Sequence, residues 1–150
     1  ARTPGPGVQA VKLRAQRVFP GCAPALAAQI RQPGDLFAHP VIREDAALFG
    51  WDIWLGAQGL TPQGLRPGPT YGDAALCLDA AITGQGLFMA WETIAADALD
   101  RGTLAAPLPL KVPSGNAFWF VTTPLSARKP AVRRFRDWLQ AEMQASAARW

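Results

Sequence analysis

The sequence holds 150 residues, of which 49% are hydrophobic and 17% are charged, and it has a formal net charge of +4 and a pI of about 9.7. This balance is typical of a globular protein and excludes a disordered chain, and no apolar run approaches the roughly 20 residues needed to span a membrane. The positive charge permits contact with nucleic acid without requiring it.

The first part of the chain predicts strands separated by a short helix. Residues 1–7 are rich in proline and glycine and predict a loop, with no secretory signal visible. Apolar and polar residues alternate over Val8–Phe19, which predicts one or two strands. Pro24 fits the first position of a helix over residues 24–32, because that position needs no amide hydrogen. Residues 41–43 predict the next strand.

A second helix is predicted before a long loop. Trp51, Trp54 and Leu55 recur at helical spacing within residues 50–58, and Gly59 is a suitable C-cap. We expect these tryptophans to anchor the core. Residues 61–70 are dense in proline and glycine and predict a loop.

The stretch from Tyr71 to Trp91 is the segment around which we expect the chain to be organised. Asp73 is a good helix N-cap, since its carboxylate can accept a hydrogen bond from the next turn. Gly84 suits the end of that helix. The continuous apolar run over residues 87–91 is typical of a strand that is covered on both faces. This stretch therefore predicts a buried helix–strand unit.

The last part of the chain predicts two more helices and two strands. A helix is expected from Glu92 or Thr93 to Arg101, followed by a short edge strand over residues 104–110, which contain two prolines. Residues 114–116 predict a turn and residues 118–123 a strand. The final helix, Pro130 to about Ala147, has one apolar stripe, formed by Val132, Phe135, Trp138, Leu139 and Met143. The order of elements predicts an α/β fold with a mixed sheet.

Catalytic chemistry has little support in the sequence. The single histidine, His39, precedes a proline in an expected turn, and no nucleophile elbow, phosphate-binding glycine loop or paired metal-binding histidines are present. Cys22 and Cys77 have no metal or redox spacing and are expected to be reduced core thiols, with a disulfide as the alternative. The sequence thus predicts no enzyme, no cofactor and no metal.

Several segments resemble the C-terminal effector-binding domain of LysR-type transcriptional regulators, in the branch related to the glycine-cleavage activator. The resemblance is collinear over roughly residues 8–142. The matching segments, in chain order, are Val18-Phe19-Pro20-Gly21-Cys22-Ala23-Pro24, Asp35-Leu36 with His39-Pro40-Val41-Ile42, Trp51-x-x-Trp54-Leu55, Leu76-x-Leu78-x-Ala80-Ala81-Ile82-x-Gly84-x-Gly86, Ala96-Asp97-x-Leu99-x-x-Gly102, and Phe135-Arg136-x-Trp138-Leu139.

This resemblance implies a two-lobed fold like that of type 2 periplasmic binding proteins. Residues 1–19 and 117–150 would form part of lobe one, whose first half lies outside the resemblance, and residues 20–116 would form lobe two. A small-molecule effector would bind in the cleft between lobes. DNA would be bound only through an N-terminal winged helix absent from this sequence. The regulator would be cytoplasmic, bacterial and homo-oligomeric, with no membrane partner.

The expected effector contacts follow from the two helix starts that the family fold would turn toward the cleft. One is at Cys22 and Ala23 and the other at Asp73, and such helix N-termini attract anions. We expect a small carboxylate beside Cys22 and Ala23, with its apolar part on Trp91 and with the wall formed by Tyr71, Asp73 and Thr93. The alternative is that water satisfies these amides and Trp91 belongs to the core.

Two differences from the family bear on this site. The family usually has Ser-Pro where this sequence has Ala23-Pro24, and Trp91 stands where relatives tend to have arginine or proline. A second function is compatible with the same architecture, namely a solute-binding protein that serves a transporter. The basic residues near the end of the chain are interpreted as a solvated helix face and not as a phosphate track.

Overall fold

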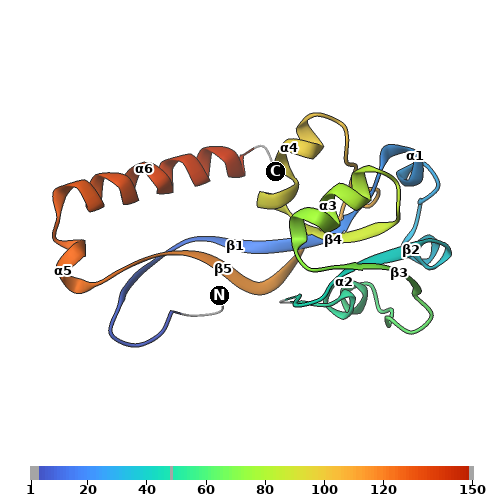
Figure 1. The fold of residues 1–150 in the computed structure, drawn as a ribbon, viewed down its shortest axis with the longest axis horizontal. Helices are drawn as coiled ribbons and strands as arrows, with labels where there is room; N and C mark the ends of the chain where they lie inside the picture. The colour runs from blue at the N-terminus through green and yellow to red at the C-terminus, as the bar shows by residue number, and fades with distance from the viewer. Residues whose placement is uncertain (1–3, 48, 149–150) are drawn as a thin grey trace. The chain divides into compact units, whose positions relative to one another are not determined.

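The structure is a computed structural model that describes residues 4–47 and 49–148. Figure 1 shows the order of the elements along the chain, which are β1 (Gln9–Gly21), α1 (Pro24–Ala27), the 3-10 helix η1 (Pro33–Ala38), β2 (Pro40–Glu44), α2 (Trp51–Ala57), β3 (Arg66–Tyr71), α3 (Ala74–Ile82), β4 (Leu87–Trp91), α4 (Glu92–Asp100), β5 (Val112–Thr122), α5 (Pro124–Ala127) and α6 (Pro130–Ala147).

The chain forms two compact units. The terminal unit consists of Ala1–Gln16 and Pro113–Trp150, and the central unit consists of Arg17–Val112. The chain therefore crosses between the units twice, once within β1 and once at the beginning of β5. The sequence placed the corresponding crossings near Phe19 and Ala117.

The central unit is built on a mixed sheet in the order β3-β2-β4-β1. Strand β2 pairs in parallel with both β3 and β4, whereas β1 pairs antiparallel with β4. In that antiparallel pair Val18 lies opposite Trp91, and Gly21 lies opposite Phe88. Strand β4 is thus an inner strand, as its continuous apolar run predicts.

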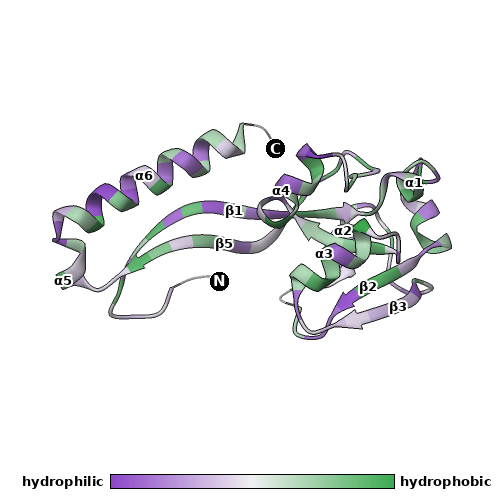
Figure 2. Ribbon diagram, turned by 45° about the horizontal axis from the view of Figure 1, so that its top comes forward, coloured by the Kyte–Doolittle hydropathy of each residue, from purple (hydrophilic) through white to green (hydrophobic). Residues whose placement is uncertain are grey.

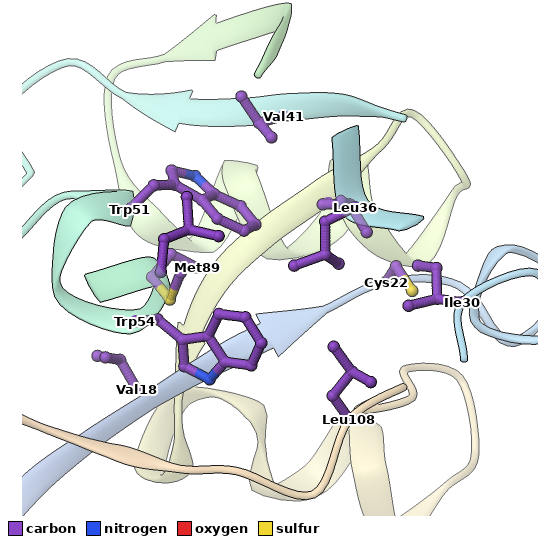
Figure 3. Packing of buried hydrophobic residues seen from close by; sticks show 11 residues of the cluster. Val18, Cys22, Ile30, Leu36, Val41, Trp51, Trp54, Met89 and Leu108 are labelled. Atoms are coloured by element: carbon purple, nitrogen blue, oxygen red, sulfur yellow. The ribbon is translucent and has the colours of Figure 1, made fainter. Parts of the chain in front are cut away.

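Side chains from alternate positions of these strands enter two hydrophobic clusters. The first cluster contains Val41 and Met89 together with Trp54 from α2, and Figure 3 shows its buried side chains. The second contains Ile42 and Phe88 with small residues from α3 and α4. Successive residues of a strand point to opposite faces, so the sheet is covered on both sides.

The helix–strand unit that the sequence singled out is confirmed in detail. The Asp73 carboxylate accepts a hydrogen bond from the backbone N–H of Leu76 at 3.0 Å and caps α3. Gly84 has a φ of 85°, as expected of a glycine that ends a helix. At Gly86 a Cβ atom would stand 2.3 Å from the carbonyl oxygen of Pro40, so the close approach of β4 to β2 requires glycine there.

Two predicted segments differ from the structure. The loop prediction for residues 61–70 is wrong beyond Leu65, because β3 runs from Arg66 to Tyr71. Its prolines are tolerated because β3 is an edge strand, where one row of amides needs no ladder partner. The strand prediction for residues 104–110 is also wrong, since the structure has only an isolated bridge between Ala105 and Cys22.

The first predicted helix is shorter than expected. Helix α1 covers only Pro24–Ala27, and the backbone then tightens into turns in which the N–H groups of Gln29 and Ile30 bond to residues three positions earlier. Such tight turns commonly end helices. Ile30 is buried in the first cluster, so the turn serves to bring this side chain into the core.

In the terminal unit, β1 and β5 are neighbours in the sheet. The predicted turn at residues 114–116 is wrong, because β5 runs through it with Gly115 at a φ of 78°. Ser114 stays inside the sheet because its hydroxyl donates to the backbone carbonyl of Gln16 at 3.2 Å. The short helix α5, capped by the Thr123 side chain, was not foreseen.

Helix α6 matches the predicted bounds but buries none of its residues. Figure 2 shows hydrophobic and hydrophilic residues alternating along it. Phe135 and Trp138 from the predicted apolar stripe are exposed, and the two rings pack on each other at 5.7 Å between centroids. The other three residues of the stripe, Val132, Leu139 and Met143, are half-buried, so this chain covers the apolar face of the amphipathic helix only in part. No helix within the described residues is long and apolar enough to cross a membrane.

The contrast between Trp54 and Trp138 makes a stability test possible. Trp54 is fully buried, and its indole N–H donates to the Leu110 carbonyl at 2.9 Å. We expect Trp54→Ala to lower the free energy of unfolding by about 3–5 kcal/mol, as large core truncations do. The matched change Trp138→Ala should cost less than about 1 kcal/mol. Denaturant unfolding measures both, and equal costs would contradict the assignment of the core.

The two cysteines give a pH test. Burial raises the pKa of Cys22 and of Cys77 from 9.0 to about 11, and at Cys77 the nearby carboxylates Glu44 and Asp73 add to the effect. Because each thiol has a higher pKa in the folded state than in the unfolded state, its contribution to stability is fully present at pH values below the unfolded-state pKa. That contribution is lost as the pH rises from about 9 toward 11. We expect the free energy of unfolding to fall over this range more steeply than in the variant with both Cys22→Ala and Cys77→Ala.

Candidate functional site

The carboxyl ends of the three parallel strands form one edge of the central sheet. Glu44 at the end of β2 lies in register with Tyr71 at the end of β3, and the backbone N–H of Asp45 donates to the Tyr71 carbonyl at 2.9 Å. Trp91 ends β4, which runs parallel to β2. In open α/β sheets, ligands bind outside the carboxyl ends of parallel strands. We call this part of the central unit the carboxyl edge.

Two of the residues expected at the site have their polar atoms engaged within the chain. The Asp73 carboxylate caps α3, as described above. The Tyr71 hydroxyl donates to the side-chain oxygen of Gln85 at 2.5 Å, so it points toward the loop that precedes β4. Both residues lie at the carboxyl edge through their backbones. A ligand at this edge would compete with these two hydrogen bonds to reach the polar atoms.

Trp91 and Thr93 lie where β4 passes directly into α4. Trp91 is half-buried and packs on both hydrophobic clusters, with its ring edge-to-face on Phe49 at 5.5 Å and tilted against Phe88 at 6.2 Å. Thr93 is the second residue of α4 and is also half-buried. The indole is therefore an anchor of the core that keeps part of its surface accessible at the edge.

Cys22 and Ala23 lie at the other end of β4. Trp91 is opposite Val18, and Cys22, which directly follows β1, is four residues further along the chain, a separation of about 13 Å at the usual rise of a strand. Cys22 is fully buried and its amide and carbonyl bond to Ala105. The carbonyl of Ala23 accepts from Leu26 and Ala27 in the short α1. The structure thus does not bring this pair together with Trp91.

A buried acidic residue beside Trp91 was missed by the sequence reasoning. Glu92 begins α4 with a side chain that is 2% exposed, and it forms ion pairs with Arg17 and, at 3.4 Å, with Lys111. The Lys111 ammonium also lies 5.4 Å from the centre of the Phe19 ring. No local pattern signals this cluster, because the partners of Glu92 are distant in sequence. A glutamate in the first turn of a helix is ordinary by itself.

The Glu92 cluster holds the ends of the central unit. Arg17 is the first residue of that unit and Lys111 is one residue from its end, so a single carboxylate joins the two segments by which the chain leaves it. Burial of the carboxylate is tolerated because both cations compensate its charge. Among the described residues, no cluster of histidine, cysteine, aspartate and glutamate could hold a metal ion.

We expect Glu92→Gln to lower the free energy of unfolding by about 2 kcal/mol. Removing one partner of a buried ion pair costs about 3–5 kcal/mol, and Arg17 and Lys111 keep some solvent contact, which reduces the loss. Asp97→Asn is the matched control on the same helix, because Asp97 pairs with Arg101 at 4.0 Å on the surface. It should change stability by less than about 0.5 kcal/mol. Similar losses in chemical denaturation would refute a special role for Glu92.

Comparison with known proteins gives the family. Residues 1–144 match the model of the LysR substrate binding domain. The chain is 31% identical over 143 residues to the glycine cleavage system transcriptional activator of Escherichia coli K12, covering 93% of this chain and 47% of that protein. It is 28% identical to the regulator TrpI of Pseudomonas aeruginosa, covering 95% of this chain and 50% of that protein. The chain thus spans about half the length of these relatives.

A solved structure supports the same assignment. The effector domain of the transcriptional regulator AmpR of Pseudomonas aeruginosa superposes with a TM-score of 0.79 at 27% identity, covering 97% of this chain and 70% of that one. The regulatory domain of CrgA from Neisseria meningitidis shares the fold at a TM-score of 0.69. These neighbours have the type 2 periplasmic-binding-protein-like fold that the sequence resemblance implied. The chain belongs to the family of LysR substrate-binding domains.

Proposed function

We propose that this chain is the effector-sensing part of a LysR-type DNA-binding transcriptional regulator. The observation that carries the proposal is the match of residues 1–144 to the family model, together with relatives that are themselves transcriptional regulators. The role is one of binding, with no catalytic step. A solute-binding protein of a transporter would have the same architecture, but the regulators to which this chain is similar favour transcription control.

The proposal places DNA binding outside this chain. An N-terminal winged helix would read the operator, and the protein would act in the cytoplasm as a homo-oligomer. The basic residues of α6 do not form a recognition pattern for an operator, because the Arg136 guanidinium donates to Asp137 at 2.7 Å and only the adjacent Arg133 and Arg134 remain beside it on the exposed face of the helix. Any binding of DNA by this chain would be the weak, salt-sensitive electrostatic kind.

We propose the carboxyl edge of the central unit as the effector contact. Trp91 would supply an aromatic surface and Thr93 a hydroxyl, with Tyr71 and Asp73 on the neighbouring strand end. The nearby Arg17 and Lys111 carry one positive charge more than the Glu92 carboxylate with which they pair, and this excess supports a ligand that carries a carboxylate. Cys22 and Ala23, which the sequence assigned to the same site, would support the fold at the other end of β4 instead.

Calorimetric titration of the full-length protein with a panel of small carboxylates tests this site. We expect a carboxylate to bind and Trp91→Ala to weaken its binding at least tenfold, because the aromatic contact is lost. Ala23→Ser should leave the affinity unchanged, since Ala23 lies one residue beyond Cys22 and therefore farther than about 13 Å from Trp91 along the sheet. If Ala23→Ser weakens carboxylate binding and Trp91→Ala does not, the effector contact lies at the beginning of α1 and not at the carboxyl edge.

The regulatory role has a separate test. The full-length protein should shift an operator fragment from its own gene neighbourhood in a mobility assay, and the effector should alter that shift. Residues 1–150 alone should give no shift that distinguishes the operator from scrambled DNA. Tight, sequence-specific binding by residues 1–150 would contradict the proposal, as would an operator complex that no carboxylate affects.

A further inference from the structure

The two segments that cross between the units are tied together on the central side of the boundary. The terminal unit ends at Gln16 in β1 and resumes at Pro113 in β5. Arg17 and Lys111, which lie just inside the central unit, both pair with the Oε1 atom of the buried Glu92. One carboxylate therefore holds both segments where they leave the central unit. We call these three residues the central tie.

A second set of side chains joins the same two strands on the terminal side of the boundary. The Ser114 hydroxyl lies 3.2 Å from both the backbone carbonyl oxygen and the side-chain Oε1 of Gln16. The backbone N–H of Asn116 donates to the same hydroxyl at 3.2 Å. All three residues are less than one-tenth exposed, so losing one of these bonds would leave a buried polar group unsatisfied. We call them the terminal tie.

The spacing of the two ties leaves few backbone bonds free between them. In β1 the ties fall on the adjacent residues Gln16 and Arg17, which point to opposite faces of the strand. On the other crossing, two residues separate Lys111 from Ser114, and the second of these is a proline. Because the proline ring fixes φ, this short link has one soft torsion fewer than its length suggests.

We propose that the central tie and the terminal tie confine bending between the two units to the Gln16–Arg17 link and to residues 112–113. A hinge is a small number of residues whose φ and ψ absorb a domain motion, and it needs rigid neighbours on both sides. Glu92 and Ser114 supply that rigidity and are therefore positioning residues. This role goes beyond effector sensing, because it holds whether or not a ligand is bound.

Hydrogen exchange of the backbone amides, followed by mass spectrometry on the protein without ligand, tests the proposal. We expect Glu92→Gln to speed exchange at least about fivefold in residues 17–18 and 110–112, and to leave residues 114–116 unchanged. Ser114→Ala should speed exchange in residues 14–16 and 114–116 and leave residues 110–111 unchanged. Asp97→Asn is the matched control on the surface of α4 and should change neither side.

Single cation variants keep the test decisive if Glu92→Gln does not fold, which circular dichroism shows. Arg17→Gln should loosen only the β1 crossing, and Lys111→Gln only the crossing into β5. The proposal is overturned if Glu92→Gln or these two variants speed exchange in α3 as much as at the crossings, because the loss is then one of global stability. It is also overturned if exchange at the crossings equals that of Asp97→Asn. Both outcomes leave the sensing role intact, because operator binding tests that role.

Discussion

Burial of β4 on both faces is the constraint on which the central unit depends. A strand with apolar side chains on both sides needs hydrophobic partners above and below it, and this chain supplies α1, η1 and α2 on one side and α3 and α4 on the other. The strand must also approach β2 closely, which only glycine permits at position 86. The positions of Trp91 and the carboxyl edge follow from this packing, because the strand ends there and α4 begins at once.

Charge acts at the boundary of the same unit. Glu92 is too buried to be stable alone, so its position requires the two cations that come from the segments leading out of the unit. This couples the beginning of α4 to the chain crossings without a hydrophobic contact. It also places cationic side chains next to the aromatic surface of Trp91.

The terminal unit buries fewer hydrophobic side chains than the central unit. Its helix α6 has a clear apolar stripe, yet Phe135 and Trp138 remain exposed and only Ala117 is a buried hydrophobic residue among those described. Few apolar side chains are removed from water, so the hydrophobic contribution to stability is concentrated in the central unit. The functional proposals rest on that unit for the same reason, since a rigid core can hold side chains in a defined geometry.

The sequence by itself determined the local elements and the family. The Asp73 cap, the run over residues 87–91 and the helix over residues 130–147 depend on neighbours in the chain, and each is present as predicted. Tertiary structure decided what depends on distant partners. The prolines within residues 66–70 predict a loop from the sequence alone. They lie in strand β3 because β2 pairs with this segment in the folded chain. The pairing register separates Cys22 from Trp91, and Glu92 meets Arg17 only in the folded chain, because neither contact has a local signal.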